Sequence, residues 1–153
     1  MKPLEASAGQ LEWAAGNLAY NLDFIPDDKL DWKPAPTANS ALEIVGHLLM
    51  VMDYSQARLA GGDGKSVEDQ TLHTREQAKA QLVSTASKYA QTLRAMEPQD
   101  LEGTMETPFG AFPMGLFATI PVTDAIHHHG QIAYIQSMLG DTESHFDMSL
   151  LPE

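Results

Sequence analysis

The apolar residues of this 153-residue chain recur at helical spacing in four separate stretches. Within each stretch they fall three, four or seven positions apart, which places them on one face of a helix. Proline or glycine ends every stretch, at Pro26, Gly61, Pro98 and Gly140. The alternation of a half-buried strand is nearly absent. The sequence therefore predicts an all-α fold, an up-down four-helix bundle.

We expect the helices to span about residues 4–24, 40–59, 74–96 and 113–139. Asn39 or Ser40 is the expected N-cap of the second helix, and Thr74 begins a capping-box pattern at the third. Segment 107–113 predicts a turn between two short extended pieces. Pro121 lacks an amide hydrogen, so it predicts either a kink in the fourth helix or a new helix start.

The length of the chain is that of one domain, residues 1–153, which buries roughly two-thirds of the surface of its unfolded form. No stretch approaches the roughly 18 consecutive apolar residues of a membrane span, and the first residues lack the apolar segment of a signal peptide. We therefore expect a cytoplasmic protein. The sequence has no cysteine, so any thiol that takes part in chemistry must arrive on a small molecule.

The formal charge of −12, from 21 acidic and 9 basic residues, repels phosphate backbones and anionic membranes. No cluster of Lys and Arg offsets this average. We therefore expect neither a nucleic-acid nor a membrane partner, and a small-molecule substrate is the better expectation. Solubility alone is sufficient to explain the acidity.

Three consecutive histidines, His127 to His129, lie inside the last helical stretch, which is otherwise apolar. Asp124 and His128 are four residues apart, so their side chains lie on one face of the helix, one turn above the other. A carboxylate and an imidazole in this arrangement can bind one divalent metal. His47, in the middle of the second helix, is the candidate third ligand, because bundle cores combine ligands from facing helices.

Three protein ligands leave coordination positions open for water or substrate, as in catalytic sites. Two imidazoles and one carboxylate suit Zn, Ni, Fe(II) or Mn, and Zn is our expectation on availability. Glu43, one turn before His47, and His127 are candidate catalytic groups for proton transfer. Either of them, or Gln131, could instead orient the ligands.

A purely structural interpretation of the same histidines stays open. Successive helical residues point about 100° apart, so at most two of the three consecutive histidines can serve one site. His129 is the one we expect to be incidental. A lone histidine in an apolar run, such as His47, is by default a core residue with one hydrogen-bond partner.

The chain resembles the DinB-like superfamily over nearly its whole length. The segments that carry the resemblance are Leu30-Asp-Trp-Lys-Pro34, Ala41-Leu-Glu-Ile-Val-Gly-His47, Thr107-Pro-Phe-Gly110, and His127-His-His-Gly-Gln131 followed by Tyr134 and Leu139-Gly140. The resemblance implies a four-helix bundle, frequent homodimers and a metal bound by one histidine of the second helix and a His-x3-His pair of the fourth. The superfamily includes thiol-dependent S-transferases and relatives of mycothiol-dependent maleylpyruvate isomerase.

His47 and His128 match two of the ligand positions that the resemblance implies, but Asp124 stands where the family pattern has histidine. Our leading hypothesis is a metal-dependent enzyme that activates an external thiol or a water against a small electrophile, as a transferase or a hydrolase. The alternative is a non-catalytic, dimeric metal-binding or structural bundle, which the Asp124 departure keeps open. A DNA-damage nuclease is disfavoured by the charge.

Overall fold

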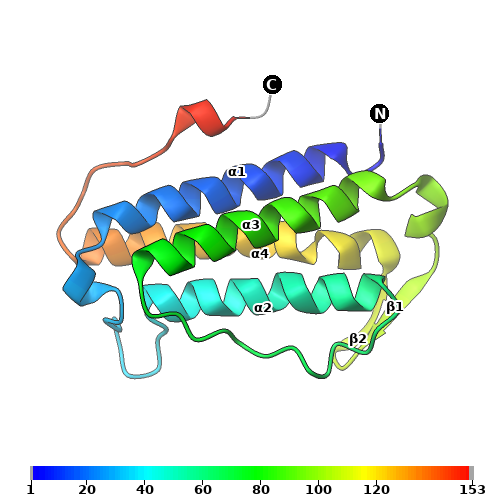
Figure 1. Cartoon of the computed structure of the whole chain (residues 1–153), viewed down its shortest axis with the longest axis horizontal. Coiled ribbons are helices and arrows are strands. Elements are labelled where there is room, and N and C mark those ends of the chain that lie inside the picture. Colours follow the sequence, from blue (N-terminus) through cyan, green and yellow to red (C-terminus); the bar gives the residue numbers. More distant parts are fainter. Residues whose placement is uncertain (1, 152–153) are drawn as a thin grey trace.

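A computed structural model describes residues 2–151 of the chain. Four helices pack as a bundle, α1 (Glu5–Asn21), α2 (Ala41–Leu59), α3 (Arg75–Ala95) and α4 (Met114–Met138) (Figure 1). Short 3-10 turns occur at Leu22–Phe24, Asp27–Lys29, Pro98–Leu101 and Met148–Leu150. The predicted four-helix bundle is confirmed. None of the helices in residues 2–151 is long and apolar enough to cross a membrane.

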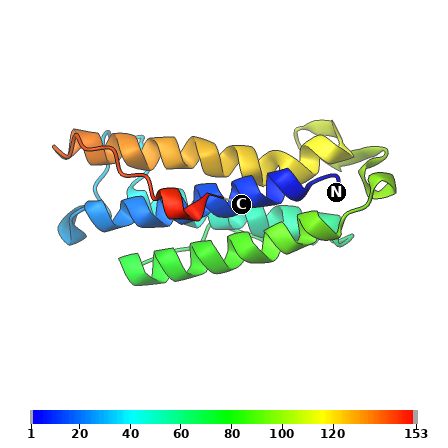
Figure 2. The ribbon, with the colours of Figure 1, turned by 90° about the horizontal axis from the view of Figure 1, so that it is seen from above.

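The helix directions do not alternate along the chain, so the up-down order predicted from the sequence is wrong, although the bundle itself is present. Figures 1 and 2 show α1 and α4 running one way and α2 and α3 running the other. The reason is the connection of residues 60–74, which returns along the length of the bundle before α3 begins. As a result α2 lies antiparallel to α4, and the first half of α2 faces the second half of α4.

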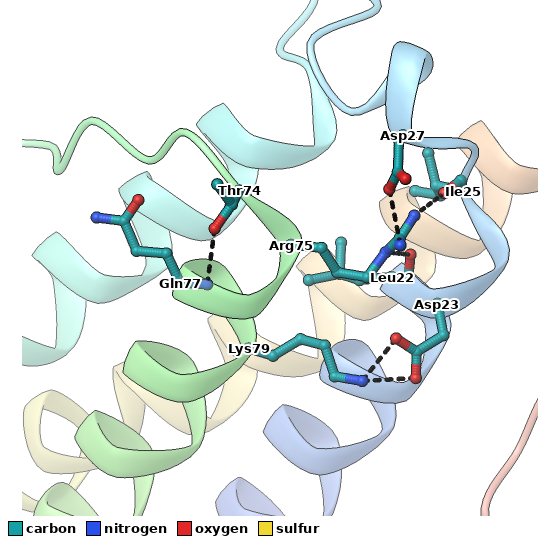
Figure 3. A network of polar contacts seen from close by, with 8 residues as sticks. All are labelled: Leu22, Asp23, Ile25, Asp27, Thr74, Arg75, Gln77 and Lys79. Atoms are coloured by element: carbon teal, nitrogen blue, oxygen red, sulfur yellow. Dashed lines mark hydrogen bonds and ion pairs between the residues drawn. The ribbon is translucent and has the colours of Figure 1, made fainter.

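The predicted helix starts are confirmed at α2 and α3. Ser40 Oγ accepts a hydrogen bond from the Glu43 amide at 3.3 Å, and Glu43 Oε2 accepts one from the Ser40 amide at 2.9 Å. These reciprocal bonds form a capping box and select Ser40, rather than Asn39, as the N-cap. At α3, Thr74 Oγ1 accepts from the Gln77 amide at 3.1 Å (Figure 3).

The segment before α4 forms the predicted turn between two extended pieces. Strands β1 (Thr104–Thr107) and β2 (Gly110–Pro113) pair antiparallel, with Thr104 opposite Pro113 and Thr107 opposite Gly110. Gly110 has φ +118°, which a residue with a side chain rarely adopts. Arg58 of α2 donates a hydrogen bond to the Glu106 carbonyl at 2.6 Å, and so connects the hairpin to the bundle.

Pro121 does not begin a new helix, because α4 runs from Met114 to Met138 without a break. Its ring is buried, and one turn away the Tyr89 hydroxyl of α3 donates to the Ala118 carbonyl at 2.9 Å. Burial raises the pKa of the Tyr89 hydroxyl well above its ordinary value, so the group stays protonated and can donate. The helix therefore continues through the proline, and the Tyr89 hydroxyl bonds to a carbonyl one turn before it.

The residues after α4 lie along α1, as both views of the ribbon show. The Asp147 amide donates to Asn17 Oδ1 at 2.8 Å, and Asn21 Nδ2 donates to the His145 carbonyl at 2.8 Å. A histidine in a short acidic tail is expected to be exposed, but the side chain of His145 is only 17% exposed. Its ring stacks on Phe24 with centroids 3.5 Å apart, and its Nε2 lies 2.8 Å from Asp141 Oδ2. The polar sequence of the tail does not show that it binds to two buried asparagines of α1.

Arg75 joins the start of α3 to the end of α1 (Figure 3). Its guanidinium donates to the Leu22 carbonyl at 2.9 Å and to the Ile25 carbonyl, and pairs with Asp27 at 2.8 Å. The last carbonyls of a helix have no partner inside the helix, and here the Leu22 carbonyl accepts from the Ile25 amide at 3.3 Å and from the guanidinium as well.

We expect Arg75→Ala to lower the free energy of unfolding by about 2–3 kcal/mol, mainly because the Leu22 and Ile25 carbonyls lose charged donors. The Asp27 pair should add little, since that carboxylate is 84% exposed. Urea unfolding measures the effect. Lys79→Ala is the matched control, because it removes only the Lys79–Asp23 ion pair at the surface and no bond to a carbonyl, and it should cost about 1 kcal/mol or less. Equal losses in the two variants would contradict this account of Arg75.

Candidate metal centre

His47, Asp124 and His128 come together in the cleft between α2 and α4. Each offers one ligand atom, and the three atoms lie within 4.8 Å of one another. His128 Nε2 is 3.4 Å from Asp124 Oδ2, and the rings of His47 and His128 have centroids 5.5 Å apart. These are the three residues that the sequence predicted as metal ligands, and the antiparallel packing of α2 and α4 is what brings them together.

Two atoms of this group are buried without a hydrogen bond. Asp124 Oδ2 and His128 Nε2 have no hydrogen-bond partner within the part of the chain that the structure describes. Buried polar atoms in folded proteins are nearly always satisfied. A carboxylate oxygen and an imidazole nitrogen that face each other unsatisfied, with a second imidazole close by, are a donor set that fits a divalent cation.

Both histidines are oriented by an oxygen on the far side of the ring. Gln131 Oε1 lies 2.6 Å from His128 Nδ1, and Asp69 Oδ1 lies 3.1 Å from His47 Nδ1. These oxygens can only accept, so each Nδ1 carries a proton, and Nε2 is the nitrogen of each ring that is left to bind a metal. Metal-binding histidines are commonly held in this way.

The charge of Asp124 makes this place favourable for a cation. Burial lowers the pKa of His128, but the contacts with Asp124 and Gln131 raise it by more, so its net shift is upward. The same negative charge that favours an imidazolium favours a metal ion at the same position. Gln131 was considered as an orienting group from the sequence, and the structure places it in contact with His128.

Asp69 is the residue that the sequence interpretation missed, because segment 61–70 reads as a flexible polar connection. In the structure this connection lies against α2, where the Gln70 amide donates to the Gly46 carbonyl at 3.3 Å. A Cβ at Gly46 would lie only 2.1 Å from the Gln70 carbonyl oxygen. An isolated glycine inside an apolar helix, directly before His47, was the available signal for this close approach.

The two candidate proton-transfer residues lie outside the three-residue group. Glu43 is exposed, caps α2 and pairs with Lys33 at 2.6 Å; the Lys33 and Ser40 hydrogen bonds lower the pKa of its carboxyl. His127 is exposed, and its ring centroid lies 5.0 Å from that of His128. Nothing in this geometry tests a catalytic role, so both assignments stay predictions.

His129 points away from the group, into the contact between α1 and α4. It is buried, its Nε2 lies 2.7 Å from Asn21 Oδ1, and its ring packs edge-on against Trp13 and Phe146. Burial lowers its pKa. This packing role agrees with the expectation that His129 is incidental to the metal ligands.

Two openings meet at His47. One is a groove of about 490 Å³ beside the 34–39 loop and the second half of α4, which His128 and Gln131 also line. The other is a pocket of about 360 Å³ between α2, the hairpin and the first half of α4. The side chain of His47 is 36% exposed, so solutes can reach the group from the surface.

The fold and this group define a class of protein, a four-helix bundle with two histidines and one aspartate in an open cleft. The sequence model of the DinB superfamily matches residues 10–132, which include all three residues of the group. The chain belongs to the DinB superfamily. The resemblance stated from the sequence is therefore confirmed.

Solved structures agree with the fold. A DinB-like protein from Bacillus subtilis is 18% identical, with a TM-score of 0.72 over 92% of this chain and 96% of its own. A conserved protein from Enterococcus faecalis is 14% identical, with a TM-score of 0.79 over 92% of this chain and 99% of its own. No curated protein matches the sequence. At these identities the structures support the fold alone.

Proposed function

We propose that this protein is a divalent-metal-dependent enzyme of the DinB superfamily, in which His47, Asp124 and His128 hold the metal. The observation that carries the proposal is the pair of buried, unbonded atoms, Asp124 Oδ2 and His128 Nε2, which face each other beside His47. Asp69 and Gln131 orient the two imidazoles with Nε2 toward the group. Zn is the metal we propose first, with Ni, Fe(II) and Mn as the alternatives that this ligand set allows.

The reaction we propose is attack by a thiol or a water on a small electrophile. A divalent cation at this site would lower the pKa of the thiol or water bound to it. In the thiol reaction a carbon–sulfur bond forms, the bond to the leaving group breaks with its electron pair, and the thiol proton ends on the leaving group. The chain has no cysteine, so the thiol is a second small molecule. His127 is the better placed of the two candidate proton-transfer groups, because Glu43 is already engaged by Lys33 and Ser40.

The open cleft favours an enzyme over the alternative of a sealed structural metal site. A structural site is closed by four protein ligands, whereas this group has three and borders a groove of about 490 Å³. Thr37, Asn39 and Gln131 contribute polar side chains to this groove beside its apolar residues, and they offer a polar nucleophile hydrogen-bond partners. A homodimer, as the family resemblance implies, and a cytoplasmic location stay predictions.

The protein purified without chelator or nickel resin should contain about one first-row metal per chain by elemental analysis. Transfer of a low-molecular-weight thiol to monochlorobimane, or hydrolysis of a small activated ester, should stop after dialysis against a chelator. Readdition of the metal should restore it. A chelator-treated protein that retains full turnover would rule out the metal-dependent mechanism, and a metal-free protein as purified would argue against the site itself.

A further inference from the structure

The pocket beside the hairpin differs in chemistry from the groove on the other side of His47. It lies between α2, the β1–β2 hairpin and the start of α4. Its walls are mainly apolar, and the side chains that matter for the argument are Met50, Val51, Phe109, Phe112, Phe117 and Ile120. Of the described residues that line it, none is Asp, Glu, Lys or Arg. A ligand in this pocket would contact hydrocarbon and aromatic rings and no charge.

Two of the polar side chains that line the pocket, Thr107 and Tyr54, already have hydrogen-bond partners in the protein. Thr107 Oγ1 donates to the Gly110 carbonyl at 2.8 Å and accepts from the Phe109 amide at 3.1 Å. The Tyr54 hydroxyl accepts from Arg58 at 3.0 Å. Because these groups have partners inside the protein, they offer a polar ligand few hydrogen bonds to replace those with water that it loses on binding.

The pocket lies directly next to the metal group. On α2, Met50 and Val51 follow His47 by three and four residues, and on α4, Ile120 precedes Asp124 by four. Residues three or four apart lie on one helix face, about 4.5–6 Å apart along the axis. His47 itself lines both the pocket and the groove. A small molecule with its apolar part in the pocket can therefore place its other end at the group.

The hairpin presents an aromatic side chain that the fold does not use. Phe109, at the turn, is 91% exposed although it borders the pocket. The hairpin is held against α2 by the bond from Arg58 to the Glu106 carbonyl, so Phe109 stays at the rim. A large exposed aromatic ring beside an apolar pocket is typical of a ligand-binding surface.

We propose that this pocket binds the uncharged aromatic or branched aliphatic part of the electrophilic substrate, while the polar nucleophile enters by the opposite groove. This inference extends the proposed function and rests on it in one respect, which is that the bound molecule is a substrate. The binding site itself rests only on the pocket, and the two can be tested separately.

The first test uses N-phenyl-1-naphthylamine, a neutral aromatic probe whose fluorescence increases in apolar surroundings. We expect one probe per chain, and at least tenfold weaker binding by Val51→Asp, which places a carboxylate in the pocket wall. Val83→Asp is the matched control, because Val83 is 50% exposed on α3 outside the pocket, and its affinity should equal that of the unmodified protein. Phe109→Ser should weaken binding several-fold, and the fold does not depend on this exposed ring.

The outcomes separate the two proposals. If the unmodified protein does not bind the probe, or if the Val51→Asp and Val83→Asp variants bind it equally, the pocket proposal is overturned whatever the metal content. If the probe binds and Val51→Asp alone weakens it in a protein without metal, the pocket stands and the proposed function fails. Binding of both metal and probe, with the metal content of Val51→Asp unchanged, supports both.

A second measurement tests the position of the pocket relative to the metal group. Hydroxamates bind Zn through two oxygens, and benzohydroxamate carries a phenyl ring where acetohydroxamate carries a methyl group. We expect benzohydroxamate to bind the Zn-loaded protein at least tenfold more tightly than acetohydroxamate, and Val51→Asp to reduce that ratio to about one. If Val51→Asp leaves this ratio unchanged, the phenyl ring lies elsewhere. The proposal that the pocket and the metal group bind one ligand together would then be overturned.

Discussion

Replacement of His128 by alanine should weaken metal binding on the order of 100-fold or more, because one of three ligands is lost. His128 is also the residue whose Nε2 is buried without a partner, so the substitution removes the atom that best supports the site. Isothermal titration with Zn after chelator treatment measures the affinity. Thermal unfolding gives a second reading, since a metal at 100 times its dissociation constant stabilises the folded state by about 2.7 kcal/mol.

The matched control for this substitution is His73→Ala. His73 is an exposed histidine in the connection before α3, and its side chain is not among the three residues of the group. We expect Zn to raise the unfolding temperature of His73→Ala as it does that of the unmodified protein, and to leave His128→Ala unchanged. If Zn stabilises both variants equally, His128 is not a ligand, and the metal centre is placed wrongly.

Replacement of Gly46 by alanine should affect both stability and metal affinity, although Gly46 touches no metal. The new Cβ would meet the Gln70 carbonyl oxygen at 2.1 Å, so the connection that carries Asp69 must move away from α2. We expect a loss of about 1–3 kcal/mol in the free energy of unfolding, as for other overpacked sites. The affinity for Zn should fall about 10- to 100-fold, because His47 loses the oxygen that orients it.

Two variants separate these effects. Asp69→Ala removes only the hydrogen bond to His47, so it should lower the Zn affinity while the exposed position leaves stability almost unchanged. Gly115→Ala adds a methyl group in the first turn of α4, where no atom lies within 4 Å, and should be neutral or slightly stabilising. A Gly46→Ala protein as stable as Gly115→Ala would show that the connection does not depend on this close approach.

Helix existence and most helix boundaries were predictable because they depend on local chemistry. The Ser40 capping box, the Thr74 cap and the turn at Gly110 each act within a few residues, and each is present in the structure. Pro121 shows the limit of this reasoning. Its missing amide hydrogen is a local fact, but α4 continues through it inside the bundle, where it packs against α1 and α2 and the Tyr89 hydroxyl of α3 reaches the Ala118 carbonyl.

The sequence by itself determined that Asp124 and His128 share one face, because helical periodicity fixes the relative direction of residues four apart. Only the tertiary structure decided that His47 meets them, since that depends on α2 lying antiparallel to α4 at a particular height. The same holds for Asp69, which reaches His47 across a connection whose path is set by the absence of a side chain at Gly46. Local spacing encodes the direction of a side chain, whereas contact between distant segments depends on how the whole core packs.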